Sequence, residues 1–284
     1  MRRILYLDAQ AGISGDMFVG ALLDAGADFE ILRRDVASLN LDGFQIRATR
    51  VIRKGLTGTK FDVLDNNTGK NVDEHHHHGE HHKKHHREHR HHHHHDEHHH
   101  SHHTHHKHHH HNHEHRSLSE IRKIIEGSSL APEISADCMA VFLILGQAEA
   151  KIHGVTIEEV HFHEVGALDT IVDIVAAVST LRQLQVDEVV CSPVQVGTGT
   201  VRCAHGVLPI PAPATLEILK GIPIYATDIH GELTTPTGAA LLKHFCNRFE
   251  FLPPLIVETI GYGAGSRERE IPNLLRAIVG KMQG

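Results

Sequence analysis

The sequence predicts an α/β protein with mixed sheets and flanking helices, interrupted by a long disordered insertion rich in histidine. Apolar residues make up 40% of the chain but aromatic ones only 4%, so the core must be built from aliphatic side chains. Strand-like and helix-like patterns alternate, whereas 27 of the 33 histidines lie between His75 and His115. We therefore expect an N-terminal α/β lobe over residues 1–70, a histidine-rich tract over 71–116 and a main α/β domain over 117–284.

The N-terminal lobe opens with a strand, a glycine turn and a helix. Residues 4–7 form an apolar run that ends at Asp8, and the helical pattern that follows the turn ends at Gly26. A second helix is expected from Asp28 to about Leu39. Two alternating segments with glycine between them, 44–55 and 56–65, predict a hairpin.

The main domain begins with Ser117 and Glu120, whose spacing is that of a helix capping box. A helix is expected from about Pro132 to His153, and Pro211 or Pro213 should stand near the start of a later one, where a missing N–H costs nothing. A further helix is expected to end near Gln185, and residues 232–245 predict a loop that leads into a helix. Strands are expected over 188–197, 222–227, 255–265 and 273–280.

Charge and hydropathy exclude several classes of protein. The net charge of -7 lies outside residues 75–115, whose five basic and five acidic residues cancel, so nucleic acid is not an expected partner. The sequence contains no run of 18 apolar residues, so no membrane-spanning segment is expected. Asp8 interrupts the N-terminal apolar run too early for a signal peptide. The four cysteines are scattered without metal-knuckle or disulfide spacing, which fits a reducing cytoplasm: Cys138, Cys191, Cys203 and Cys246.

The histidine tract from His75 to His115 is interpreted as an array of transition-metal ligands. Neutral imidazole binds nickel, copper and zinc, and the tract offers no apolar residues for a core. An affinity tag is disfavoured because the run is internal and broken by charged residues, while a solvated linker without a metal role is the alternative. Bare imidazoles follow the Irving–Williams order, so the choice of one metal must come from elsewhere.

A second candidate metal site follows the tract in the segment from His161 to Asp173. If this segment begins extended, His161 and His163 point to one face with Glu164 close behind. Asp169 and Asp173 are four residues apart and share a helix face. Two imidazoles with carboxylates suit a divalent transition metal, Asp169 is also a candidate catalytic carboxylate, and the alternative is that the histidines only cap the helix.

The turn after the first strand is a candidate binding site for a phosphate. Asp8 follows the strand at its carboxyl end, where α/β sheets place ligands, and the turn from Gly12 through Ser14 to Gly15 leads into a helix N-terminus. Asp16 is a candidate for binding metal or accepting a proton. The alternative is a tight turn with a helix cap, since the spacing matches neither a Walker A nor a dinucleotide fingerprint.

Two later loops carry further candidates. His205 lies in a loop flanked by glycine and stiffened by proline, and is a candidate proton acceptor or an idle surface histidine. Thr235 and Thr237 precede a helix and could receive an anion, although helix capping explains Thr237 equally well. His153 and His244 are interpreted as helix-face residues.

Taken together, five long segments in order make the chain resemble the LarC family of nickel-insertion proteins. They are LYLDAQAGISGDMFVGALLDAG, a histidine-rich middle, VHFHEVGALDTIVDIV, GTVRCAHGVLPIPAPATLEILKG and ELTTPTGAALL. The resemblance implies a nickel-inserting lyase of the chelatase or cyclometallase type. Its substrate would be pyridinium-3,5-bisthiocarboxylic acid mononucleotide, which takes up Ni²⁺ through two sulfurs and a ring carbon and loses a ring proton.

The resemblance also implies CTP hydrolysis with Mn²⁺ or Mg²⁺, handled in the family by a C-terminal portion beyond the length of this chain. We therefore expect either a separate C-terminal polypeptide as partner or a shortened member of the family, and a homo-oligomer. Two alternatives stay open. One is a nickel store or chaperone that hands metal to another insertase. The other is a zinc-dependent hydrolase, which would lack the nucleophile or the third ligand at long spacing that is usual for such enzymes.

Overall fold

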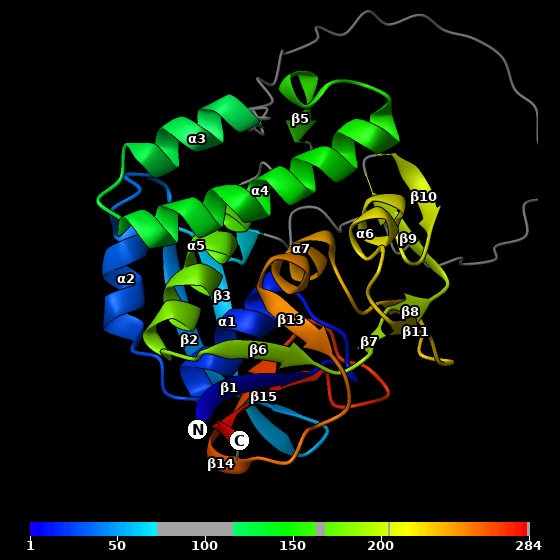
Figure 1. Cartoon of the computed structure of the whole chain (residues 1–284). Helices are drawn as coiled ribbons and strands as arrows, with labels where there is room; N and C mark the ends of the chain where they lie inside the picture. Colours follow the sequence, from blue (N-terminus) through cyan, green and yellow to red (C-terminus); the bar gives the residue numbers. More distant parts are fainter. Residues whose placement is uncertain (73–115, 163–167, 204, 283–284) are drawn as a thin grey trace, which may run out of the picture.

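The computed structural model describes residues 1–72, 116–162, 168–203 and 205–282, and these contain one large mixed sheet covered by helices (Figure 1). The helices are α1 (Gly15–Asp24), α2 (Phe29–Ala37), α3 (Leu118–Glu126), α4 (Pro132–His153), α5 (Leu168–Gln183), α6 (Pro213–Ile218), α7 (Pro236–Phe245) and the 3-10 helix η2 (Ile157–Glu159). The predicted fold class is confirmed.

The large sheet has seven strands in the order β13-β6-β1-β15-β14-β3-β2. They are β1 (Arg2–Asp8), β2 (Phe44–Arg53), β3 (Leu56–Asp65), β6 (Glu188–Cys191), β13 (Cys246–Phe249), β14 (Ile256–Ala264) and β15 (Leu274–Met282). β13, β6 and β1 run parallel, so their carboxyl ends meet at one edge. β15 is antiparallel to β1 and to β14, and β2 to β3.

Four two-stranded sheets complete the described strands. They are formed by β4 (Arg116–Ser117) with β5 (His161–Phe162), β7 (Val194–Gln195) with β11 (Ile224–Tyr225), β8 (Gly197–Thr198) with β12 (Gly231–Glu232), and β9 (Thr200–Cys203) with β10 (Gly206–Pro209). The single strand predicted over 188–197 was wrong. Residues 188–191 join the large sheet and 194–195 pair elsewhere, because Pro193 between them cannot donate to a ladder.

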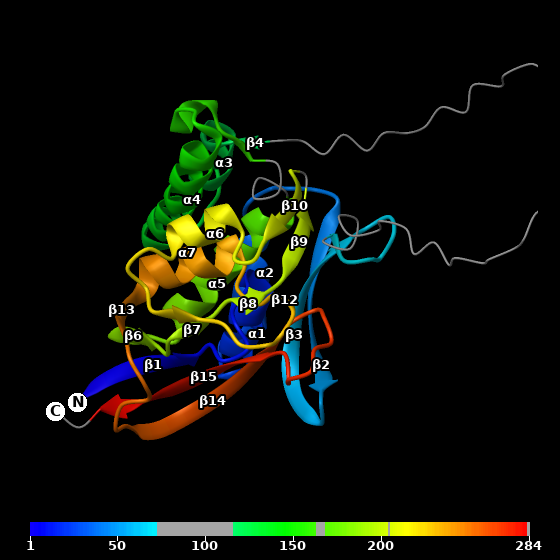
Figure 2. The same ribbon diagram turned by 90° about the vertical axis from the view of Figure 1, so that its right-hand side faces the viewer.

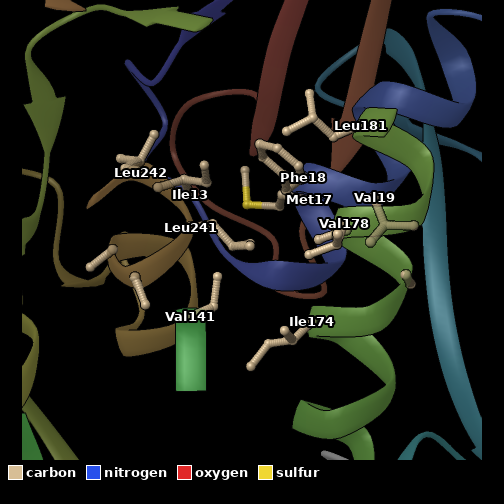
Figure 3. Close-up of a cluster of buried hydrophobic side chains, with 14 of the residues drawn as sticks. Ile13, Met17, Phe18, Val19, Val141, Ile174, Val178, Leu181, Leu241 and Leu242 are labelled. Atoms are coloured by element: carbon tan, nitrogen blue, oxygen red, sulfur yellow. The ribbon is translucent and has the colours of Figure 1, made fainter. Parts of the chain in front are cut away.

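The helices lie on one face of the sheet, as Figure 2 shows, and their apolar sides form the core. Met17 and Phe18 of α1 meet Ile174 of α5 and Leu241 of α7 in this layer (Figure 3). α5 is buried along most of its length, which explains its nearly continuous apolar sequence. The core therefore fixes α1, α5 and α7 against one another and against the sheet.

Most of the predicted elements are confirmed, including their end signals. Ser117 and Glu120 form the capping box of α3, Asp28 caps α2 and Pro213 is in the first turn of α6. β2 and β3 form the predicted hairpin. The alternative that Thr237 caps this helix is wrong, because Thr235 accepts the hydrogen bond from the Gly238 N–H over 3.2 Å.

Strands from residues 1–70 and from residues 117–284 share the large sheet, so these two parts are continuous in structure. Their division into separate domains stays a prediction. The tract His75 to His115 lies outside the described residues, so its predicted disorder also stays a prediction. Within the described part of the chain, no helix is long and apolar enough to cross a membrane.

Candidate functional site at the carboxyl edge of the sheet

Asp8 ends β1 at the edge where the parallel strands finish, as the sequence predicted. Its side chain is buried, with 7% exposed. One carboxylate oxygen accepts a hydrogen bond from Arg276, which stands opposite Asp8 in the register of β1 and β15. The other oxygen has no hydrogen-bond partner among the described residues. A buried carboxylate is thus half satisfied at the position where such sheets bind ligands.

The negative charge of Asp8 contributes to a raised pKa in two tyrosines. Burial, followed by the negative charge of Asp8, raises the pKa of Tyr6 to about 12. The same two causes raise the pKa of Tyr225 above its usual value. Both phenols therefore stay protonated near neutral pH, where they are hydrogen-bond donors rather than bases.

The loop after β1 is pinned to the segment that precedes α7. The Ile13 N–H donates to the Leu233 carbonyl over 2.9 Å, and the Thr235 N–H donates to the Ile13 carbonyl over 3.0 Å. Gly12 has a φ of +76°, and a Cβ on it would lie 2.0 Å from the Leu233 carbonyl oxygen. Only glycine fits this approach, which sets the N-termini of α1 and α7 side by side.

The first turn of α1 also meets the Asp173 carboxylate of α5. A Cβ on Gly15 would lie 2.6 Å from an Asp173 carboxylate oxygen, so that carboxylate sits directly against the turn. Ser14 is the N-cap residue of α1, but its side chain makes no capping hydrogen bond and its hydroxyl donates to Asp16 instead. The three-residue segment from Ile13 to Gly15 therefore touches both α7 and α5. This brings the predicted phosphate-binding and metal-binding segments together.

Asp16 is joined to a buried lysine that the sequence analysis did not identify. The Lys60 ammonium donates to Asp16 over 2.6 Å and lies 3.2 Å from Asp62, and only 5% of Lys60 is exposed. Burial alone would raise the pKa of Asp16, but the charge and hydrogen bonds of Lys60 outweigh it and lower that pKa. Burial likewise opposes the charge of Lys60, yet the two carboxylates raise its pKa above the usual value.

The network around Lys60 extends to the last described residues before the tract. Asn71 donates from its side-chain amide to Asp62 over 2.9 Å and forms a bridge with Leu64. Lys60 and Arg276 were missed because the carboxylates they contact at the site, Asp16 and Asp8, are distant in sequence, and Asp62 was missed together with Lys60. The available signal was two opposite charges, Lys60 and Asp62, on the same side of a strand with apolar neighbours.

Asp169 and Asp173 both lie on α5, four residues apart, as predicted. Asp169 has 9% of its surface exposed, and one of its carboxylate oxygens has no hydrogen-bond partner in the described part of the structure. His161 begins β5, opposite Ser117 in β4. His163 and Glu164 lie outside the described residues, so their predicted role as ligands with His161 stays a prediction.

His205 occupies the turn between β9 and β10, where its ring lies against that of His153 at the end of α4. The two ring centroids are 4.7 Å apart. Its predicted role as proton acceptor stays a prediction. Across residues 1–72, 116–162, 168–203 and 205–282, no group of three or more His, Cys, Asp or Glu side chains is arranged to hold a metal ion.

Comparison with known proteins points to one family. A family model described as "Nickel insertion protein" matches residues 5–284. The chain is 44% identical over 277 residues to a "Pyridinium-3,5-bisthiocarboxylic acid mononucleotide nickel insertion protein" of Desulfitobacterium hafniense, covering 98% of the chain and 58% of that relative. It is 42% identical over 280 residues to the protein of the same name from Geobacillus kaustophilus, covering 98% and 60%.

A third protein of that name, from Staphylococcus epidermidis, is 38% identical over 278 residues, covering 98% of the chain and 59% of the relative. The chain thus spans about three fifths of the length of these curated relatives. No solved structure matches it.

Proposed function

This chain belongs to the nickel insertion protein family, and we propose that it takes part in inserting Ni²⁺ into pyridinium-3,5-bisthiocarboxylic acid mononucleotide to form the nickel-pincer cofactor. The observation that carries the proposal is the family match over residues 5–284, together with the names of the relatives. The histidine tract, which supplies 27 imidazoles, fits the handling of such a metal. Nickel is here a substrate of the reaction.

The residues around the first turn of α1 suggest where each part of the substrate would bind. We assign the nucleotide phosphate to the turn that opens α7, where Thr235 and Thr237 stand at a helix N-terminus beside Gly12. The α1 turn is less suited to direct phosphate contact, because the carboxylates of Asp16 and Asp173 already face it. The Asp8 oxygen without a partner among the described residues would bind a divalent ion or accept a hydrogen bond from the substrate.

The metal would enter from the other side of the same turn. Asp173 lies against Gly15, and Asp169 precedes it by one helical turn on α5. We propose that Asp173, with the preceding His161, His163 and Glu164, receives Ni²⁺ beside the bound nucleotide. An ion held by imidazoles and carboxylates keeps open positions into which the two sulfurs of the substrate can enter.

Formation of the nickel–carbon bond requires that the ring carbon lose its proton while its electron pair goes to the metal. Asp16 is poorly suited to accept this proton, because Lys60 lowers its pKa and holds its carboxylate. Asp169 is better suited, because its buried carboxylate has an oxygen without a hydrogen-bond partner among the described residues. We therefore assign the proton to Asp169 and a positioning role to Asp16.

The reaction itself is the test of this proposal. Purified chain is incubated with Ni²⁺, the substrate nucleotide, CTP and Mg²⁺ or Mn²⁺, and the nucleotide is followed by mass spectrometry. The incubation is repeated with a polypeptide that carries the remaining length of the relatives, which tests a separate C-terminal partner. We expect a nickel-containing product that is lost in the His161→Ala/His163→Ala double variant. Full activity of that variant would refute the metal site.

A nickel store or chaperone is the second candidate function, and the histidine tract is the observation that favours it. Deleting residues 75–115 distinguishes an insertase from a nickel store. An insertase without the tract should still form product when nickel is plentiful, because the tract would only collect the ion. A store should lose most of its bound nickel and show no product under any condition.

A further inference from the structure

Two histidines that are distant in sequence meet on the surface at the end of α4. His153 is the last residue of α4, and His205 lies in the turn of the β9–β10 hairpin, where it is exposed. Their ring centroids are 4.7 Å apart and the ring planes are inclined by 52°. The His153 Nε2 atom lies 3.3 Å from a carboxylate oxygen of Glu149, one turn earlier on α4. The surroundings are therefore solvent-accessible, charged and rich in imidazole.

The spacing of the two rings is that of imidazoles sharing one metal ion. A metal–nitrogen bond of about 2.1 Å places the centroid of a five-membered ring about 3.2 Å from the metal. Two such rings at a right angle around the ion have centroids about 4.5 Å apart, and at a tetrahedral angle about 5.2 Å. The observed 4.7 Å falls between these values.

Two further features favour a cation at this place. Histidines that bind metals usually donate their other ring N–H to a carboxylate, and Glu149 stands in that relation to His153. The carbonyl end of α4, a helix of 22 residues, also points its negative partial charge toward the site. Lys151, on the same turn of α4, forms an ion pair of 2.7 Å with Glu217 of α6, so its ammonium group does not occupy the proposed cation position.

We propose that His153 and His205 form a binding site for Ni²⁺ or a similar transition-metal ion, with Glu149 orienting the His153 ring. The described residues supply two ligands, so water completes the coordination and the ion exchanges readily. Such a site suits transfer of the metal rather than storage.

The location fits a transfer role. Arg116 and Ser117, the first described residues after the tract, form β4, which pairs with β5. The ribbon views place β4 and β5, the end of α4 and β10 in one corner of the protein (Figures 1 and 2). The site thus stands where the chain returns from the histidine tract. Its use in nickel delivery rests on the proposed function, whereas its ability to bind metal does not.

Metal binding is tested in the chain of residues 1–284 with all 27 tract histidines replaced by serine, so that the tract does not mask the site. Folding is checked by circular dichroism, and Ni²⁺ binding is measured by equilibrium dialysis. We expect His153→Ala/His205→Ala to bind one ion fewer per chain than its parent, and Glu149→Gln to weaken that site about tenfold. His244→Ala is the matched control, since His244 pairs with Asp137 and should leave the binding unchanged.

The His161→Ala/His163→Ala variant should keep the ion bound at His153 and His205, which distinguishes the two sites. Equal stoichiometry and affinity in the parent and the folded His153→Ala/His205→Ala variant would overturn the proposal. If no product forms with any chain, the proposed function fails while the dialysis result still stands.

Delivery is tested with the tract intact and nickel limiting. We expect His153→Ala/His205→Ala to slow formation of the nickel product and excess Ni²⁺ to restore the rate. A defect that excess nickel does not restore would instead place His205 in the chemical step, and an unchanged rate would overturn the transfer role.

Discussion

Lys60 on β3 and Asp16 in the first turn of α1 form an ion pair of 2.6 Å inside the protein. The pair links the hairpin of residues 44–65 to the helix that carries the candidate site. Asp62 shares the same ammonium group, and Asn71 is bonded to Asp62. The charged network therefore holds together the first turn of α1, β3 and the chain just before the histidine tract.

Replacing Lys60 with Met should destabilise the fold strongly. The substitution keeps most of the side-chain volume but leaves Asp16 and Asp62 close together without their cation, a loss that costs about 3–5 kcal/mol in buried pairs. Urea unfolding followed by circular dichroism measures it. The control Arg33→Met removes an exposed pair with Glu30 and should change the free energy of unfolding by less than about 1 kcal/mol. Equal effects of the two substitutions would show that the network is not structural.

Acid should weaken the same network through Asp16. Because the folded-state pKa of Asp16 lies below its unfolded value, its contribution is present above about pH 4 and is lost as pH falls through the folded pKa. The unfolding free energies of the wild type and Asp16→Asn should therefore converge as pH falls below about 4. Urea titrations from neutral to strongly acid pH measure both curves. A constant gap between them would contradict the lowered pKa.

Gly12→Ala should separate the loop after β1 from the segment before α7. Alanine at a φ of +76° is strained by about 1–2 kcal/mol, and its Cβ would also collide with the Leu233 carbonyl. Gly154→Ala is the matched control, because Gly154 has a φ of +66° with nothing within 4 Å of the added Cβ. We expect Gly12→Ala to lower the unfolding free energy by clearly more than Gly154→Ala, measured in urea. Equal losses would mean that the loop can move away at no cost.

Local signals in the sequence predicted the elements well because they act over a few residues. The capping box of Ser117 and Glu120 and the proline at the start of α6 depend only on neighbouring backbone groups, and the structure confirms them. The alternative cap at Thr237 was a signal of the same kind. Pro236 at the first position of α7 indicates Thr235 rather than Thr237 as the cap, and this signal was not used.

Long-range relationships in the candidate site were not predictable from such signals. The placement of Asp8 at the edge of the sheet followed from strand and turn patterns. Its pairing with Arg276, and that of Asp16 with Lys60, depend on which strands become neighbours in the sheet. The contact between His153 and His205 likewise depends on how the β9–β10 hairpin lies against α4. Residue spacing carries no information about these distances.

Asp169→Asn should uncouple stability from activity. Asp169 is buried with one carboxylate oxygen unpartnered among the described residues, so removing its charge should leave the unfolding free energy unchanged or raise it. If Asp169 accepts the ring proton, insertion of nickel should slow by about 10²–10⁴-fold. Residues placed for function commonly show this opposition between stability and activity. Urea unfolding and mass spectrometry of the nucleotide measure the two effects.

Asp137→Asn provides the opposite pattern as a control. Asp137 is bonded to Arg182 and to His244, where it joins α4, α5 and α7 away from the first turn of α1. Its replacement weakens hydrogen bonds to charged groups, which should cost about 1–3 kcal/mol, while the rate of insertion by the folded protein stays unchanged. A stable Asp169→Asn that retains full insertion would remove Asp169 from the chemistry. The proton would then go to another candidate group, either Asp173, whose carboxylate lies against Gly15, or His205.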